Sequence, residues 1–311
     1  MTNEIFKSRY IRVVIGIGEG IRGDQTPSEF WTLDDHRVSA TIQAYGGETQ
    51  GTAQVKIFGM TLSEMNKLTA MGPVMYQLRG ANSIQIFAGD DLNSLSTIYF
   101  GTIMEAIADF NSAPDVAMNI TAQSAAIAAM MPAQDYHYDG IISAAKVLEY
   151  LAGKLKWEFQ NLDIGAGNMG GTGGLDVLCV DPTYTGSYLE QIKQCVEEHK
   201  NEMDYAQEYK STTSILKIKH RWSVYPSPEQ IVSPYTNMIG YPVFCQSNML
   251  LKFIFMPTVN IGGKITVKDS IVVPANRDWN VHSVTHELES MTPGGKWETT
   301  CGVMPSDFIK Q

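Results

Sequence analysis

The chain lacks the features that would carry it into or across a membrane. None of its 311 residues belongs to a run approaching the ~18 uncharged apolar residues of a membrane-spanning helix, so we expect no membrane insertion. The segment Met1 to Lys7 has neither the apolar core nor the small-residue cleavage site of a signal peptide. We therefore expect no export by the usual route.

Cysteine is scarce, and its spacing excludes two common uses of it. The four cysteines are Cys179, Cys195, Cys245 and Cys301. No two of them form a Cys-x-x-Cys pair, and the spacings fit neither a zinc module nor a compact disulfide framework. We expect reduced thiols in a protein that is made and kept in a cytosol.

Basic residues are outnumbered, with 23 Lys and Arg against 33 Asp and Glu, giving a formal charge of −10. Proteins that hold nucleic acid do so with Lys and Arg that displace counterions from phosphates. The acidic balance argues against that task, and it is compatible with a surface that nucleic acid passes without sticking. Hydrophobic residues at 44% and charged residues at 18% nevertheless describe a folded protein with a substantial core.

Period-two alternation of apolar and polar residues dominates the first third. Residues 37–45 and 52–57 alternate on either side of Gly46-Gly47, which is typical of a hairpin. Thr61 with Glu64 fits a capping box that opens a short helix. Further strands are predicted at 83–88, 97–105 and 115–123. Because closure removes exposed strand edges, five or six strands in about 125 residues favour a closed or nearly closed barrel.

The middle of the chain has helical spacing instead. Helices are predicted at 141–154 and from Ser187, where Glu190 completes a second capping box, to about Tyr209. Three proline residues between 223 and 238 indicate a linker, after which the extended pattern returns. Strands are predicted at 157–160, 175–180 and 214–220 in the middle, and at 248–255, 264–268, 279–288 and 297–302 at the end.

These patterns predict a mainly β protein with an α+β insert. Two tube-like β-barrel domains flank a smaller α+β module. The expected boundaries are 1–130 for the first barrel domain, 131–222 for the insert, and 223–311 for the linker and second barrel domain.

Two glycine motifs resemble nucleotide-binding sequences. Gly18-x-Gly20-x-x-Gly23 follows an apolar strand, but no helical pattern follows to point its N-terminus at a pyrophosphate. The stretch from Gly165 to Thr172 nearly matches a phosphate-binding loop, but Gly171 stands where the phosphate-binding lysine is needed. We interpret both motifs as loops and assign no cofactor.

The candidate catalytic and metal-binding groups also favour structural interpretations. His282 and His286 lie four residues apart; on a strand this is roughly 13 Å, too far to share one ion. Adjacent residues of Asp34-Asp35-His36 point to opposite faces of a strand, and Glu197-Glu198 fits the exposed face of a helix. We assign no catalytic, cofactor-binding or metal-binding residue, and we expect no enzyme.

Two ordered sets of segments resemble phage baseplate hub proteins. The first comprises Ala53–Leu68 (AQVKIFGMTLSEMNKL), Ser83–Asp90 (SIQIFAGD) and Ile98–Ile103 (IYFGTI), although the last is one residue short of the family pattern F-x-G-x-I. The second comprises Ile239–Pro242 (IGYP), Phe253–Val267 (FIFMPTVNIGGKITV), Val281–Leu288 (VHSVTHEL) and Gly294–Thr299 (GGKWET). Together they cover both ends of the chain, in the order in which the family has them. The family includes Mu-type hubs, late-control D proteins and type VI secretion spike bases.

The resemblance implies a structural, homotrimeric hub of a contractile tail, without cofactors. Three chains, each with two tube-like barrels, would form a pseudo-sixfold ring that joins the sixfold tail tube to the threefold central spike. The implied partners are the tube protein, a separate spike protein and other baseplate proteins, and DNA would pass through the lumen without specific binding. The implied location is the virion tail baseplate, assembled in the host bacterial cytoplasm. His286 becomes a structural position.

Other hypotheses stay open. Within the same class stand hub-like proteins of long non-contractile tails and type VI or tailocin counterparts. A tail-tip peptidoglycan hydrolase would need an acidic or metal-based site. A carbohydrate-binding β protein would need exposed aromatic residues around a pocket, for which Tyr136, Tyr138 and Trp222 are the candidates.

Overall fold

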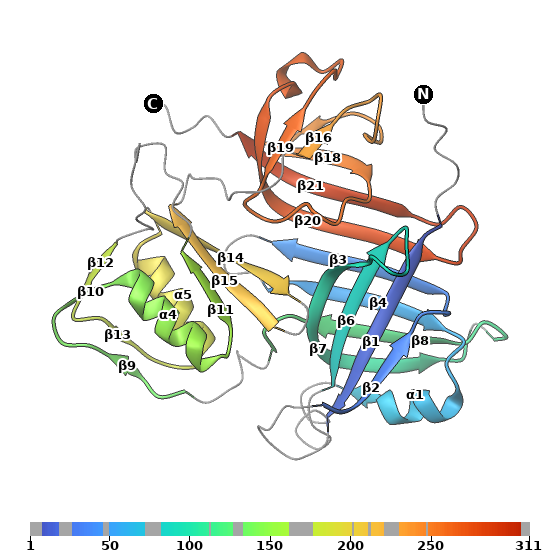
Figure 1. The fold of residues 1–311 in the computed structure, drawn as a ribbon, viewed down its shortest axis with the longest axis horizontal. Helices are drawn as coiled ribbons and strands as arrows, with labels where there is room; N and C mark the ends of the chain where they lie inside the picture. The colour runs from blue at the N-terminus through green and yellow to red at the C-terminus, as the bar shows by residue number, and fades with distance from the viewer. Residues whose placement is uncertain are drawn as a thin grey trace.

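The fold consists of two β units that share one sheet and an α+β module that stands beside them (Figure 1). We name the first β unit for residues 8–126, the α+β module for residues 133–220 and the second β unit for residues 230–305. The computed structural model describes residues 8–18, 27–45, 50–71, 82–111, 113–126, 133–161, 177–200, 202–210, 213–220, 230–246 and 248–305.

The first β unit follows the alternation of its sequence. Its strand β3, for example, alternates buried and half-buried residues from Val38 to Gln43, so one face packs in the core and the other stays near solvent. The capping box of α1 is confirmed, since Thr61 and Glu64 bond reciprocally. The elements are β1 (Tyr10–Gly18), β2 (Pro27–Leu33), β3 (Val38–Tyr45), β4 (Thr52–Phe58), α1 (Leu62–Leu68), β5 (Ala70–Met71), β6 (Ser83–Gly89), β7 (Ser96–Asp109) and β8 (Ala117–Gln123).

In the α+β module, two helices form their own core with a three-stranded sheet, β11-β15-β14. Leu148 and Leu151 of one helix and Ile192 of the other are fully buried in that core. The elements are β9 (Tyr136–His137), β10 (Ile141–Ser143), α4 (Ala144–Lys154), β11 (Glu158–Asn161), β12 (Leu178–Val180), β13 (Thr183–Tyr184), α5 (Tyr188–Glu198), β14 (Met203–Lys210) and β15 (Thr213–His220).

The second β unit is built on two long strands, β20 and β21. A third core cluster, with Phe253, Trp279 and Val303 among its members, lies under them. The elements are β16 (Gln230–Val232), β17 (Val243–Phe244), β18 (Met249–Ile254), β19 (Lys264–Val267), the 3-10 turn η1 (Val273–Ala275), β20 (Asp278–Ser290) and β21 (Trp297–Pro305).

One sheet runs through both β units, and this corrects the expectation of closed or nearly closed barrels. Its order is β17-β18-β21-β20-β3-β4-β8-β7-β6-β1-β2, with β5, β16 and β19 attached to its side. Strand β20 pairs with β3 from Ser283↔Tyr45 to Ser290↔Val38. Because β20 satisfies the edge of β3, that edge does not return to β1 or β2, and no pairing among the described strands closes either unit.

Three local predictions also need correction. The second helix ends at Glu198 and not near Tyr209, since residues from Met203 pair in full with β15 as strand β14. The first helix begins at Ala144, because Ile141–Ser143 pairs with β12. In the predicted linker, residues 230–232 form β16 beside β19, while residues 223–229 lie outside the described part. Tertiary pairing outweighed local propensity at each place.

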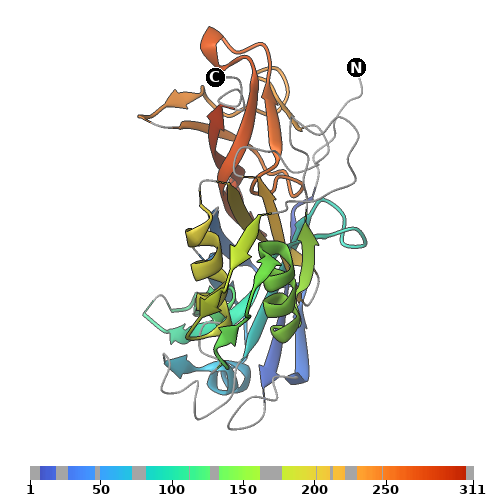
Figure 2. The same ribbon diagram turned by 90° about the vertical axis from the view of Figure 1, so that its left-hand side faces the viewer.

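The module packs against the side of the sheet where β14 approaches β7, and Figure 2 shows it in front of the first β unit with the second unit above. Phe255 and Leu288 of the second unit belong to the core of the first, so the two β units share apolar contacts as well as strand pairing. Among the described helices, none is long and apolar enough to cross a membrane.

Candidate functional site

The most extended surface feature is the outward side of the shared sheet. Opposite the buried Val55, Ile57 and Ile120, most of its outward positions are hydroxyl, amide and charged side chains. The exposed Ile107, Leu250 and Ile254 lie on the same side as apolar exceptions. One register row joins Glu298, Glu287, Thr41, Gln54, Thr121 and Glu105 across six strands. We call this surface the polar face; it comprises Ser39, Thr41, Gln43, Thr52, Gln54, Lys56, Glu105, Asn119, Thr121, Gln123, Lys252, Ser283, Thr285, Glu287, Glu289, Lys296, Glu298 and Thr300.

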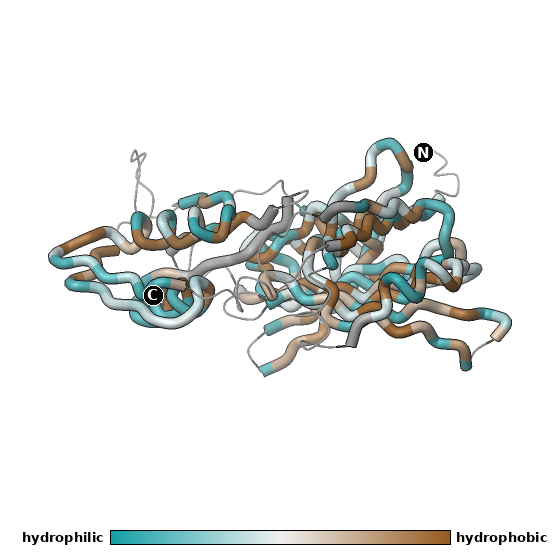
Figure 3. Tube along the Cα trace, turned by 90° about the horizontal axis from the view of Figure 1, so that it is seen from below, coloured by the Kyte–Doolittle hydropathy of each residue, from teal (hydrophilic) through white to brown (hydrophobic). Residues whose placement is uncertain are grey.

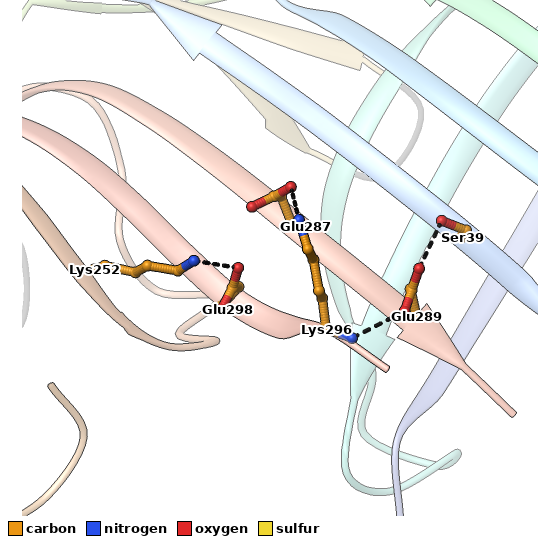
Figure 4. Close-up of polar contacts among 6 residues, drawn as sticks. All are labelled: Ser39, Lys252, Glu287, Glu289, Lys296 and Glu298. Atoms are coloured by element: carbon orange, nitrogen blue, oxygen red, sulfur yellow. Dashed lines mark hydrogen bonds and ion pairs between the residues drawn. The ribbon is translucent and has the colours of Figure 1, made fainter. Parts of the chain in front are cut away.

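Ion pairs link the strands of the polar face where the two β units meet (Figure 4). Lys252 Nζ of β18 lies 2.5 Å from Glu298 Oε1 of β21, and Lys296 Nζ lies 2.6 Å from Glu287 Oε1 of β20. The Lys296 backbone N–H donates to Glu289 Oε2 at 3.0 Å, and Ser39 of β3 donates to the other oxygen of Glu289 at 3.4 Å. The chain of contacts therefore runs from the second β unit into the first.

These pairs leave the polar face almost neutral. It carries four carboxylates, Glu105, Glu287, Glu289 and Glu298, and three lysines, Lys56, Lys252 and Lys296. The hydrogen bond from Lys296 lowers the pKa of Glu287 against the opposing effect of burial, and the same bond raises the pKa of Lys296. Both groups therefore stay charged, and the net charge of the face is one negative unit.

The second surface feature is apolar and lies at the free end of the sheet. We call it the apolar edge; it consists of the exposed residues Ile239, Tyr241, Val243, Phe244, Leu250 and Ile254. They lie on β17, on β18 and on the segment before β17, which bonds to β18 through Ile239 N–H and Lys252 C=O. Figure 3, which views the chain from below, shows hydrophobic and hydrophilic residues alternating along its traces. Clustered exposed apolar residues of this kind mark contact surfaces.

Neither glycine motif acquires a nucleotide site in the described residues. Gly18 ends β1, and the next described element is β2, which runs antiparallel to β1. A dinucleotide fingerprint needs a helix there. The other glycine-rich stretch, residues 165–174, lies outside the described part of the chain.

The two histidines of β20 have different environments and do not meet. His286 is buried, its Nδ1 lies 2.9 Å from Thr299 Oγ1, and Phe255 packs edge-on against its ring. Burial lowers its pKa to about 4. His282 is exposed, at a bulge where pairing skips from Val281 to Ser283. Within the described residues, no group of three His, Cys, Asp or Glu side chains is placed to hold a metal ion.

The carboxylate candidates have structural partners. Asp34 accepts two hydrogen bonds from the Arg12 guanidinium, at 2.5 and 3.0 Å, and so ties β1 to the end of β2. Glu197 pairs with Lys200, and Glu198 accepts a hydrogen bond from Tyr184 at 2.7 Å. No acid, orienter and base come together at Asp34-Asp35-His36.

Two of the three aromatic candidates, Tyr136 and Tyr138, belong to the described part of the module. The Tyr136 ring packs 5.5 Å from Tyr150 and 6.2 Å from Tyr184, within the module. Tyr138 is exposed nearby, and Trp222 lies outside the described residues. Neither the polar face nor the apolar edge was predicted from the sequence, although the outward residues of each alternating strand were a signal for them.

The chain matches the family model described as Baseplate hub gp41 over residues 10–294. No curated protein matches its sequence.

Several solved structures share the fold at identities of 10% or less. One is the E. coli c3393 protein, a type VI secretion component with structural similarity to phage T4 tail proteins gp27 and gp5. Its TM-score is 0.61 and its sequence identity is 9%, and the match covers 88% of this chain and 76% of that one. Another is the 43 kDa tail protein of prophage MuSo2 from Shewanella oneidensis: TM-score 0.59, 9% identity, covering 96% and 98%. A third is from the Francisella PdpA–VgrG complex: TM-score 0.60, 8% identity, covering 98% and 59%.

Proposed function

The chain belongs to the baseplate hub gp41 family and is a structural component of the phage tail baseplate, and from this premise we propose its place in the particle. It is the hub of a contractile tail: a homotrimeric ring that joins the sixfold tail tube to the threefold central spike and lets DNA pass. The observation that carries the proposal is the single sheet that runs through both β units.

The shared sheet suits a change of symmetry. Each chain has two β units joined edge to edge through β3 and β20, so it offers two neighbouring wall segments. Three chains supply six such segments, a pseudo-sixfold ring built on a threefold axis. In this proposal the two β units, within 1–130 and 223–311, act as tube-like domains, with the α+β module of 131–222 outside the wall. Three separate core clusters support that division.

The polar face suits the inner surface of such a ring. Its hydroxyl and amide side chains hold water, and its three lysines are balanced by four carboxylates. Lys252 and Lys296 are paired with Glu298 and Glu287, so little free positive charge faces the lumen to hold phosphates. DNA would then slide along the wall without specific binding.

The apolar edge suits the contact between subunits. It lies at the β17 end of the sheet, while β2 lies at the other end. A contact between two different surfaces of the same chain repeats around an axis and closes a ring. We propose that the apolar edge of each chain packs against the first β unit of the next chain. Burial there would remove its exposed side chains from water.

The remaining partners follow from the same arrangement. One rim of the ring meets the tube protein, the other meets the spike, and other baseplate proteins surround it. Two of the similar structures support a spike partner. The E. coli protein is itself similar to T4 gp27 and gp5, and the Francisella structure is a complex with VgrG. Assembly would take place in the host bacterial cytoplasm.

Native mass spectrometry of the purified chain, with negative-stain imaging of the same sample, tests the ring. The expected result is a species of three times 34.4 kDa that appears as a ring with a central hole. A chain that stays monomeric alone and when mixed with the tube and spike proteins of its own phage would overturn the proposal.

The lumen assignment has its own test, which uses lysine substitutions in assembled particles. Glu105→Lys with Glu289→Lys would change the polar face from one net negative charge to three net positive charges, and DNA ejection should slow because lysines retain phosphates. The control is Glu149→Lys, at an exposed position of α4. If the double substitution leaves ejection unchanged, the assignment of the polar face to the lumen is wrong.

A further inference from the structure

A cluster of reactive side chains in the α+β module has no part in the proposed function. Cys179 of β12 lies with its Sγ 3.2 Å from His199 Nε2. Cys195 and His199 are four residues apart at the end of α5, so they lie on the same side of that helix. Tyr184 completes the cluster, with its hydroxyl 3.9 Å from Cys179 Sγ. The helix thus presents a thiol and an imidazole to one cysteine of the neighbouring strand.

The two thiols of the cluster are not equivalent. A hydrogen bond from the Cys195 thiol lowers the pKa of Cys179, and His199 and Tyr184 add to this effect against the cost of burial. The pKa of Cys195 is raised, because its proton is held by the Cys179 sulfur and its site is buried. Cys179 is therefore the more acidic thiol of the two, and Cys195 is the one that keeps its proton.

The other two cysteines lack these contacts. Cys301 is buried in the core of the second β unit, where burial alone raises its pKa. Cys245 is exposed beside β17. The chain therefore contains its own comparison between a thiol activated by neighbours, a buried thiol and an exposed one.

The surroundings limit what Cys179 can react with. Its residue is 1% exposed, which leaves no access for a bulky acyl substrate. His199, which contacts the sulfur, is itself half-buried, and in our proposal a small oxidant reaches the sulfur past its ring. Thiolates next to a second cysteine are typical of sites that oxidise reversibly.

We propose that Cys179 and Cys195 form a peroxide-sensitive thiol pair that oxidises to a disulfide between β12 and α5. The Cys179 thiolate attacks one oxygen of hydrogen peroxide; the O–O bond breaks, and the leaving hydroxide takes a proton to become water. Cys195 then attacks the resulting sulfenic acid; an S–S bond forms, the S–O bond breaks, and a second water leaves. Two thiols are oxidised by two electrons, and one peroxide is reduced.

His199 is a positioning residue in this scheme, since it holds the thiolate without exchanging electrons. The pairing chemistry is independent of the hub assignment. Its timing rests on the proposed function: a particle assembled in a reducing cytosol would meet oxidants after release. The disulfide would then fix α5 to β12 in the released particle.

Peptide mapping of the full chain tests the proposal directly. The protein is treated with hydrogen peroxide, blocked with N-ethylmaleimide and digested with trypsin without reduction. Cleavage after Lys156, Lys193 and Lys200 places Cys179 in peptide 157–193 and Cys195 in peptide 194–200. The expected product is these two peptides joined, two hydrogens lighter than their sum, and separated again by dithiothreitol.

Variants assign the roles of the residues. Cys195→Ser should let sulfenic acid accumulate on Cys179, detected by dimedone, while Cys301→Ser should leave the disulfide unchanged. His199→Gln should move the alkylation profile of Cys179 to higher pH and slow its oxidation about tenfold at pH 7, an effect that a purely structural residue would not have.

Three results would overturn the proposal. One is a native chain in which peptides 157–193 and 194–200 stay unlinked under peroxide. Another is Cys179 reacting no faster than Cys301. The third is a linkage that forms equally with Cys245, which would indicate random oxidation of unfolded chain.

Discussion

The two β units share a sheet but treat their apolar residues differently. Among the described residues, the first unit exposes five large hydrophobic side chains, Phe30, Tyr45, Leu62, Ile107 and Phe110. The second unit is shorter and exposes eleven, namely the apolar edge with Ile231, Tyr235, Ile271, Val273 and Met291. The first unit buries most of its large hydrophobic side chains within the single chain. The second unit leaves more of them exposed to water, which is energetically unfavourable.

This difference indicates which unit depends on a neighbour. The polar face continues from the second unit into the first, because the register aligns Glu287 of β20 with Thr41 of β3. Six of the eleven exposed hydrophobic residues of the second unit form the apolar edge at the free end of the sheet. The single chain therefore completes the sheet across both units. The free end of the sheet is the part that we propose to contact another subunit.

The largest expected effect on assembly comes from charging the apolar edge. Tyr241→Glu and Val243→Glu should each weaken the trimer, because each loses about 2 kcal/mol of burial, or about thirtyfold in affinity, before the cost of burying a charge. The residues are 58% and 57% exposed in the single chain, so its own stability should hardly change. Native mass spectrometry over a dilution series measures the effect.

The matched control lies in the α+β module, outside the proposed contact. Ile141 of β10 is 65% exposed, and Ile141→Glu makes the same kind of change there. Trimers that dissociate equally with Ile141→Glu, or that survive both edge substitutions, would show that the apolar edge of the second unit does not depend on a neighbour.

Acid should destabilise the seam between the units, which is the pairing of β3 with β20, through His286. Its pKa is about 4 in the folded chain because of burial, and ~6.5 when unfolded. The unfolded state therefore binds a proton that the folded state refuses as pH falls from 6.5 towards 4. Stability is full above pH 6.5 and should decrease by about 3 kcal/mol by pH 4.

Urea unfolding at several pH values measures this dependence. His286→Gln should remove the His286 part of the slope, since Gln does not titrate, whereas His282→Gln, at an exposed position of the same strand, should leave it unchanged. Equal pH dependence in the parent chain and His286→Gln would mean that the seam carries no such penalty.

The sequence predicted what local patterns determine. Both capping boxes, Thr61 with Glu64 and Ser187 with Glu190, form as expected, and the hairpin of β3 and β4 follows from its alternation. The resemblance to baseplate hubs rested on the order of several loose motifs, and no single motif was sufficient for it. The family match agrees with it.

Contacts between distant segments could not be predicted from these patterns. The pairing of β3 with β20 joins Val38 to Ser290, and nothing in either strand names its partner. The extent of α5 was overestimated because strand β14 is specified by its partner β15. Cys179 and His199 likewise appeared as unrelated residues, since only folding brings a strand and a helix end together.

The smallest expected effect tests how tightly the first unit is packed, at a glycine of the family-like segment. A Cβ on Gly101 of β7 would lie 2.9 Å from the Gln123 carbonyl oxygen and 2.5 Å from the Tyr99 hydroxyl. Tyr99 is fully buried and the carbonyl is backbone, so neither gives way easily. Gly101→Ala should destabilise the chain by about 1–3 kcal/mol through overpacking.

Gly153→Ala is the matched control, because no atom lies within 4 Å of its Cβ position. In the α4 helix, alanine should instead stabilise by about 0.5–1 kcal/mol. Urea unfolding of both variants should therefore shift the midpoint in opposite directions. If Gly101→Ala unfolds like the parent chain, the core of the first unit has room for a methyl group, and its contrast with the second unit rests on the surface alone.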